Sequence, residues 1–174
     1  MSEDASGRLF LQFSSRKLLQ LSSRIDTCLA RLSEEQIWAR NGDHENAVGN
    51  LALHLCGNVR QWIISSIGGA PDTRQRDTEF SARGNVGGKE LRERLGTTVS
   101  QATAVINALN TKRLADRLVI QGTDVSVLDA IYHVVEHFAM HAGQIIFITK
   151  MRSAAPLDFS QDVQSAGRQE RQVP

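Results

Sequence analysis

Three histidines recur at every fourth position of one segment: His133, His137 and His141. Each residue of an α-helix turns by about 100°, so residues four apart differ by only about 40° and these side chains form a stripe along one helix face. Two histidines one turn apart can bind one metal ion, and a third from a neighbouring helix completes a facial set. His54, in a different apolar segment, can supply that third ligand, whereas His44 lies in a polar stretch and is expected to be solvated.

The spacing leaves two choices for the ligands on the histidine-rich segment. Either His133 and His137, or His137 and His141, can join His54. The His-Glu-x-x-His motif of zincin metalloproteases is absent, because Glu136 directly precedes His137. Two Glu-x-x-His motifs on separate helices, which a carboxylate-bridged di-iron bundle needs, are also absent. The sequence therefore predicts a mononuclear site with three neutral imidazoles, which is typical of a catalytic rather than a structural zinc ion.

The segment around His54 carries a polar stripe. Residues 46–66 are apolar around most of the helix circumference, as expected for a central helix of a bundle. On the His54 side, however, Asn50, Asn58 and Gln61 follow one another at steps of one or two turns. A bundle helix normally faces its core with aliphatic residues, so the stripe predicts a wet cavity or a site.

Four segments show the apolar periodicity of amphipathic helices. They span about residues 8–32, 46–66, 89–110 and 126–151. Capping-box sequences begin at Ser33 and Ser126, and the first of them predicts a short helical turn ending near Trp38. Apart from a short extended piece at 118–120, the chain has almost no strand signal. We predict an all-α fold, a four-helix bundle formed by residues 1–152 as one domain, followed by a polar tail over residues 153–174.

Residues 68–88 form the long connection between the second and third predicted helices. They contain five glycines, Pro71 and charges of both signs without a sustained period. Loops longer than about 12–15 residues in a compact domain are usually functional or disordered. The segment is therefore a candidate lid or partner surface, with a solvated connection as the alternative. Its arginines Arg74, Arg76 and Arg83 could bind an anionic substrate.

The composition excludes several classes of function. Lys and Arg number 20 against 19 Asp and Glu, and aromatic residues make up 5%, which argues against a nucleic-acid-binding surface. No apolar run reaches the roughly 18 residues of a membrane span, and the N-terminus lacks a signal pattern. Cys28 and Cys56 are too few for a disulfide framework and suit a reducing compartment, so we expect a cytoplasmic protein. Cys56 lies about 200° from His54 around the helix and is expected to be a small core residue.

Two segments resemble signatures of the DinB/YfiT-like superfamily. The sequence EHFAMHAGQI, residues 136–145, resembles its His-x-x-x-His-x-Gly-Gln motif. The sequence NLALHLCGNVRQWI, residues 50–63, resembles its second-helix His-Leu-x-x-Asn block, and GGAPDTRQRDTEFS resembles an uncharacterised bacterial branch. The resemblance covers most of residues 8–152.

The resemblance implies a DinB/YfiT-like four-helix bundle, commonly a homodimer, in which three histidines hold one divalent metal ion. Carried over by position, the ligands are His54, His137 and His141. Zinc or nickel is the expected ion, with iron as a further candidate. Five other residues are candidates for the pocket or for contacts behind the ligands: His133, Asn50, Asn58, Gln61 and Gln144.

Such an ion lowers the pKa of bound water from about 15.7 toward about 7, or binds and deprotonates a thiol. Relatives in the superfamily include thiol S-transferases, a maleylpyruvate isomerase and proteins assigned as metal-dependent hydrolases. The sequence thus predicts a hydrolase or a transferase of a low-molecular-weight thiol that acts on a small molecule. Hydrolysis needs a general base, for which Glu136, Asp77 and Glu79 are the nearest candidates. The alternative is a non-catalytic metal- or ligand-binding bundle that acts through dimerisation or partner contact.

Overall fold

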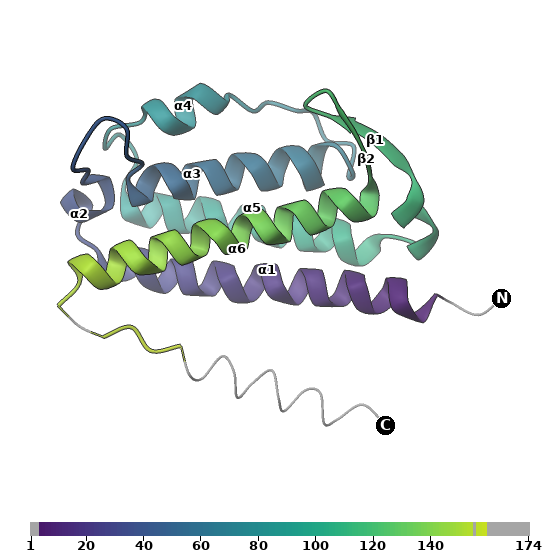
Figure 1. The fold of residues 1–174 in the computed structure, drawn as a ribbon, viewed down its shortest axis with the longest axis horizontal. Helices are drawn as coiled ribbons and strands as arrows, with labels where there is room; N and C mark the ends of the chain where they lie inside the picture. The colour runs from purple at the N-terminus through teal and green to yellow at the C-terminus, as the bar shows by residue number, and fades with distance from the viewer. Residues whose placement is uncertain (1–3, 155, 160–174) are drawn as a thin grey trace.

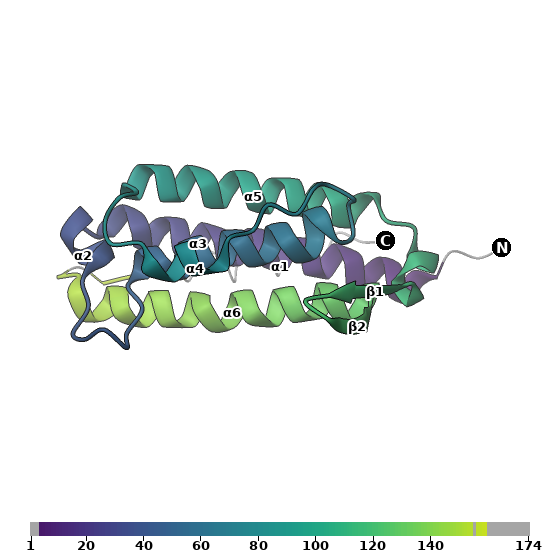
Figure 2. The same ribbon diagram turned by 90° about the horizontal axis from the view of Figure 1, so that it is seen from above.

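A computed structural model describes residues 4–154 and 156–159 of the protein. Four long helices form the body of the fold: α1 (Ala5–Arg31), α3 (Val48–Val59), α5 (Gly88–Ala108) and α6 (Val127–Arg152). They extend along a common long axis (Figures 1 and 2), with α1 packed against α5 and α6, and α3 packed against the same two helices. The predicted all-α four-helix architecture is confirmed.

Local sequence signals set where the helices begin. The Asp4 side chain accepts a hydrogen bond from the Gly7 amide at 3.1 Å and caps α1. Ser33 forms a capping box at the start of the short helix α2 (Glu34–Trp38), and Ser126 forms another at the start of α6, where its hydroxyl accepts from the Asp129 amide at 3.0 Å. Both capping boxes were expected from the sequence.

The core runs the length of the bundle between the four long helices. Its largest fully buried side chains include Leu18, Ile25, Leu55, Ile63, Leu91, Ile106, Ile131, Phe138 and Ile145. Truncation of a buried aromatic such as Phe138 to alanine typically costs about 3–5 kcal/mol, because transfer free energy is lost and a cavity is left. No helix in the described ranges is both long and apolar enough to cross a membrane.

The second predicted helix has an unexpected continuation. After α3 the chain forms a π-helical segment, Arg60–Ser65, in which the Ser66 amide bonds to the Gln61 carbonyl at 3.0 Å and the Gly68 amide to the Ile63 carbonyl at 2.9 Å. The helical stretch predicted over 46–66 is therefore present, but its last turns are wider than those of an α-helix.

The connector between the third and fourth long helices is more ordered than expected. A 3₁₀ turn (Thr111–Ala115) leads into an antiparallel hairpin of β1 (Arg117–Ile120) and β2 (Thr123–Ser126). The predicted extended piece lies in β1, whereas β2 was missed. Its turn signal is weak because Gln121, with φ 52°, takes the left-handed position that Asn or Asp more often occupies beside a glycine.

The segment predicted as a long loop contains a short helix, α4 (Arg76–Ser81), which packs along α3 (Figure 1). We call residues 72–82 the covering segment. In the predicted C-terminal tail, Leu157 and Phe159 pack against the core, and the Arg24 guanidinium lies 5.4 Å from the Phe159 ring centroid. Residues 160–174 of that tail lie outside the described residues.

Candidate metal centre

Three histidine side chains from two helices converge between α3 and α6. His54 lies midway along α3, and His137 and His141 lie one turn apart on α6. The Nε2 atom of His137 is 3.1 Å from that of His54 and 3.1 Å from that of His141. We call these residues the histidine cluster. They can hold a metal ion, because one ligand atom from each lies within 4.8 Å of the others.

The fourth histidine of the pattern has a different environment. The His133 ring packs on Trp62 with centroids 4.2 Å apart, and its centroid is 5.6 Å from that of His137. Of the two ligand sets that the spacing allowed, the structure therefore brings together the one that contains His141. His133 lies one turn before His137 on α6, between the cluster and Trp62 of the π-helical segment.

Hydrogen bonds determine the imidazole tautomers at two of the three positions. His54 Nδ1 is 2.9 Å from Glu79 Oε2, and a carboxylate only accepts, so this nitrogen carries the proton. His141 Nδ1 is 2.7 Å from Gln144 Oε1, and the same argument applies to the amide oxygen. Both rings therefore present an unprotonated Nε2 atom to His137. A single N–H on His137 can satisfy only one of them, and a cation between the three nitrogens satisfies all.

His137 and His141 favour the neutral form that metal binding requires. Burial and the neighbouring histidines lower the pKa of His137 to about 3, and its Nδ1 atom is buried without a partner among the described residues. Burial also lowers the pKa of His141. Nitrogens 3.1 Å apart can both lie within a Zn–N bond length, about 2.0–2.1 Å, of one ion. The donor set, the spacing and the charge state thus fit a divalent metal.

Glu79, one of the candidate general bases, lies behind the cluster rather than in front of it. Its carboxylate contacts His54 on the Nδ1 side and forms a two-bond ion pair with Arg74, at 2.8 and 2.9 Å. Burial raises the pKa of Glu79, but the hydrogen bonds from Arg74 and His54 outweigh that effect and lower it. The expected roles of Glu79 as a base and Arg74 as an anion binder are therefore replaced by their contact with each other.

The polar stripe of α3 holds the covering segment. Asn50 is fully buried, and its amide nitrogen donates to the carbonyls of Glu79 at 2.8 Å and Ala82 at 3.1 Å. Gln61 accepts from Arg74 Nη1 at 2.9 Å and donates to Asp72 at 2.8 Å. Asn50 and Gln61 thus contact the segment on either side of His54. Asn58 is also buried, but its amide oxygen has no partner among the described residues.

The remaining chemistry-bearing residues predicted from the sequence lie away from the cluster. His44, Glu136 and Asp77 are exposed. The Arg76 guanidinium lies 5.2 Å from the Phe80 ring centroid, and Arg83 donates to backbone carbonyls of its own segment. None of these five makes a described contact with the cluster. The exposure of His44 agrees with the sequence analysis.

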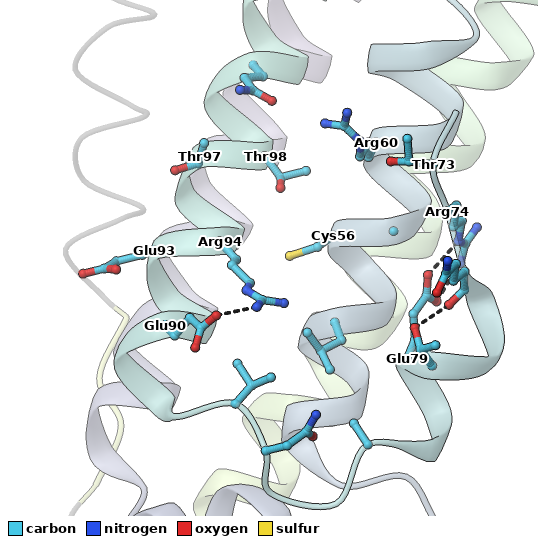
Figure 3. Close-up of a pocket in the computed structure, with 18 residues that line it drawn as sticks. Cys56, Arg60, Thr73, Arg74, Glu79, Glu90, Glu93, Arg94, Thr97 and Thr98 are labelled. Atoms are coloured by element: carbon cyan, nitrogen blue, oxygen red, sulfur yellow. Dashed lines mark hydrogen bonds and ion pairs between the residues drawn. The ribbon is translucent and has the colours of Figure 1, made fainter. Parts of the chain in front are cut away.

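A cavity of about 780 Å³ lies on the other side of α3, between that helix, α5 and the covering segment (Figure 3). Cys56 points into it, away from His54 as expected, but it is half-buried at the edge of the core rather than within it. Burial raises the pKa of its thiol to about 12, so the unreactive protonated form prevails at neutral pH. Arg74 and Glu79 also line the cavity and separate it from the histidine cluster.

A second cavity, of about 540 Å³, begins beside the cluster on α6. It is lined by Gln144, which bonds to His141, and by Leu51, one turn before His54 on α3. Its apolar wall continues along α6 through Phe147, Ile148 and Met151. None of the three cluster histidines lines this cavity, and Gln144 is the lining residue that contacts the cluster.

A family described as "Protein of unknown function (DUF1572)" matches residues 5–159, which include every element of the fold. The chain belongs to this family. The match spans both histidine-bearing helices and the covering segment, so the DUF1572 region contains all parts of the candidate site. No curated protein matches the DUF1572 chain significantly.

Solved structures resemble the DUF1572 chain in fold. A DinB-like protein from Bacillus cereus is 14% identical with a TM-score of 0.66, over 86% of this chain and 95% of that one. A conserved protein from Enterococcus faecalis is 15% identical with a TM-score of 0.65, over 86% of this chain and 97% of that one. The DUF1572 chain has a DinB-like all-α fold, so the fold that the resemblance of the two histidine motifs implied is confirmed.

Proposed function

We propose that the protein is a mononuclear metal-dependent enzyme in which His54, His137 and His141 hold one divalent ion, zinc or nickel, with iron as a further candidate. The observation that carries the proposal is the convergence of three Nε2 atoms that hydrogen bonds among themselves cannot satisfy. When bound, such an ion supplies positive charge that lowers the pKa of a coordinated thiol or water.

The surroundings favour a thiol over water as the nucleophile. Both oxygens of Glu79 are engaged by Arg74 and His54, and Glu136 and Asp77 are exposed. The described residues therefore place no free carboxylate where it could accept a proton from water on the Nε2 side. A thiol has a pKa near 8.5, against about 15.7 for water, so it needs far less assistance to ionise. Thiol S-transfer is the first candidate reaction and hydrolysis the second.

The cavity beside His141 supports a small-molecule substrate with an apolar group. Gln144 orients His141 and supplies a polar edge, and Phe147, Ile148 and Met151 provide apolar contacts farther along α6. Residues seven apart on a helix are separated by about 10 Å, so Ile148 contacts a group about that far from the plane of His141. A low-molecular-weight thiol and an apolar electrophile fit this arrangement.

A non-catalytic binding module that acts as a homodimer is the second candidate function. It is supported by apolar side chains that are 41–72% exposed on α6: Leu128, Tyr132, Met140, Phe147 and Met151. Clusters of exposed apolar residues are typical of interaction surfaces. Both cysteines are free, which fits the cytoplasmic location that we also propose.

Turnover by protein of known metal content tests the proposal. The purified chain is stripped with a chelator, reloaded with zinc or nickel, and assayed with cysteine and a bimane electrophile, and separately with a panel of nitrophenyl esters. We expect metal-dependent thiol conjugation that exceeds ester hydrolysis. Stoichiometric metal without turnover in either assay would favour the binding module. Absence of bound metal would contradict the proposed site itself.

A further inference from the structure

We propose that Glu79, held by Arg74, is the positioning residue that fixes His54 as an Nε2 ligand of the metal. The proposal deepens the proposed function and rests on it for metal affinity. The tautomer of His54 in the metal-free protein does not depend on whether the protein binds a metal or is an enzyme. Glu79 reaches His54 from α4, a helix that follows α3 by a long connection, so its role is not encoded in either histidine motif.

The His54 ring is in contact at both nitrogens. Glu79 Oε2 is 2.9 Å from Nδ1, and His137 Nε2 is 3.1 Å from Nε2. The side chains of His54 and Glu79 are only 7% and 8% exposed, so water competes little for the bond between them. A carboxylate that accepts the Nδ1 proton leaves the Nε2 lone pair free and increases its basicity, as in carboxylate–histidine–zinc sites.

Arg74 keeps the Glu79 carboxylate ionised and oriented. Its Nε atom donates to Oε1 at 2.8 Å and its Nη2 atom to Oε2 at 2.9 Å, which is the bidentate geometry of a strong ion pair. Its Nη1 atom donates to Gln61 Oε1 at 2.9 Å. Arg74 Nη2 also lies 3.2 Å from His54 Nδ1, but the shorter contact of that nitrogen is to the carboxylate. With these contacts, Arg74 is committed to Glu79 rather than to a substrate anion.

A glycine in α3 makes room for the pair. A Cβ atom at Gly57 would lie 1.9 Å from Glu79 Oε1 and 2.9 Å from Arg74 Nε. Glycine is unfavourable within a helix because of its conformational freedom, so its presence here needs a reason. The close approach of the Glu79 carboxylate to the α3 backbone supplies one. Any side chain at this position would displace Glu79 from His54.

The covering segment is held so that Glu79 faces His54. Asn50, one turn before His54, binds the carbonyl of Glu79 itself at 2.8 Å. Gln61, two turns after His54, binds the Arg74 side chain. The polar stripe that runs from α3 into the π-helical segment therefore holds the covering segment at Asn50 and at Gln61, and His54 between them contacts the Glu79 carboxylate.

The test compares the His54 tautomer and the zinc affinity in variants of the full chain. Long-range ¹H–¹⁵N spectra of the metal-free wild type should show the proton on His54 Nδ1. Glu79→Ala should give a mixture of tautomers and bind zinc about 10–100-fold more weakly in competition with a chromophoric chelator. Glu79→Gln can still accept the Nδ1 proton, so it should keep the tautomer and lose less affinity. Gly57→Ala should reproduce the effect of Glu79→Ala.

Asp77→Ala is the matched control, because Asp77 is an exposed carboxylate on the same short helix. Circular dichroism verifies that each variant is folded. If Glu79→Ala does not fold, the comparison of Glu79→Gln with the wild type still decides the test. The proposal is overturned if wild-type His54 carries its proton on Nε2, or if folded Glu79→Ala binds zinc within twofold of Asp77→Ala. If the wild type binds no zinc, the proposed function fails, while the tautomer comparison still decides the role of Glu79.

Discussion

The two helices that carry the histidine cluster support their histidines in different ways. His54 on α3 is 6% exposed and has a contact at each ring nitrogen, one of them from the covering segment. His137 and His141 on α6 are half-buried and owe their arrangement to their spacing of one turn. The added support on α6 comes from Gln144, an exposed residue three positions from His141.

The histidines of α6 are held by residues close to them in the sequence, whereas His54 of α3 is held by residues far from it in the sequence. On α6 the helix itself places two imidazoles together, so formation of the helix is sufficient. On α3 the single histidine depends on residues 20–25 positions farther along the chain, and these reach it only when the covering segment packs. We therefore expect substitutions around His54 to affect folding as well as metal binding, and those around His141 to affect metal binding alone.

The largest effect is expected for His137→Ala, because the Nε2 atom of His137 contacts those of both other cluster members. Stoichiometric metal should be lost, a greater effect than the about 10–100-fold that outer-shell substitutions cost. Elemental analysis and chelator competition measure it. His133→Ala, one turn earlier on the same helix, should retain the metal. Equal metal content in the two variants would contradict the assignment.

Asn50→Ala should destabilise the protein by about 1–3 kcal/mol, because it leaves the buried backbone carbonyl of Glu79 without its donor. Urea unfolding of the metal-free protein measures the change. Asn58→Ala is the control on the same stripe, and a smaller loss is expected there because its amide oxygen has no partner among the described residues. A loss at Asn58 equal to that at Asn50 would contradict the role of Asn50 in holding the covering segment against α3.

Acid should destabilise the metal-free protein. The folded state lowers the pKa of His137 to about 3, so as pH falls below about 6.5 the unfolded chain takes up a proton first and stability decreases. The slope is at most about 1.4 kcal/mol per pH unit for this histidine, and less because water screens a half-buried ring. Urea unfolding at pH 7.5, 6.5 and 5.5 measures it, and His137→Gln should flatten it. If the stability of the metal-free wild type to urea did not change between pH 7.5 and 5.5, the burial of a neutral His137 would be contradicted.

The smallest effect is expected for Gln144→Ala. Its bond to His141 is 2.7 Å long but lies at an exposed position where water can replace the amide oxygen. Zinc affinity should fall by less than the about tenfold lower limit typical of outer-shell partners, with unchanged stability to urea. A larger loss than in Glu79→Ala would reverse the comparison between the helices.

Local signals in the sequence were sufficient for much of the fold and part of the site. The capping boxes at Ser33 and Ser126, the apolar periodicity and the four-residue spacing of the α6 histidines act within one or two turns, so they are visible without a structure. The polar stripe on α3 also indicated that His54 faces something polar. Its identity could not be predicted, because residue types alone do not reveal contacts between segments.

The remaining parts of the site depend on such long-range contacts. The choice between His133 and His141 depends on the crossing of α3 and α6, whose histidines are 83 residues apart. The contact between Glu79 and His54 depends on how the covering segment packs. One local signal could have indicated it: Gly57 lies within a helix, one turn after His54, at a position where the carboxylate of Glu79 approaches the backbone closely.

The π-helical segment after α3 constrains how many residues the chain can have between His54 and the end of that segment. A regular helix would need about one residue fewer over this segment, so deletion of Arg60 would let it close to a regular helix. Residues after Ser65 would keep their direction relative to His54, but Gln61 and Trp62, which lie within the segment, would turn away from their present directions. Gln61 would then leave Arg74, and Trp62 would leave His133. Replacement of Arg60 by another residue carries no such penalty. Homologous chains should therefore vary freely in residue type at this position but contain no alignment gap.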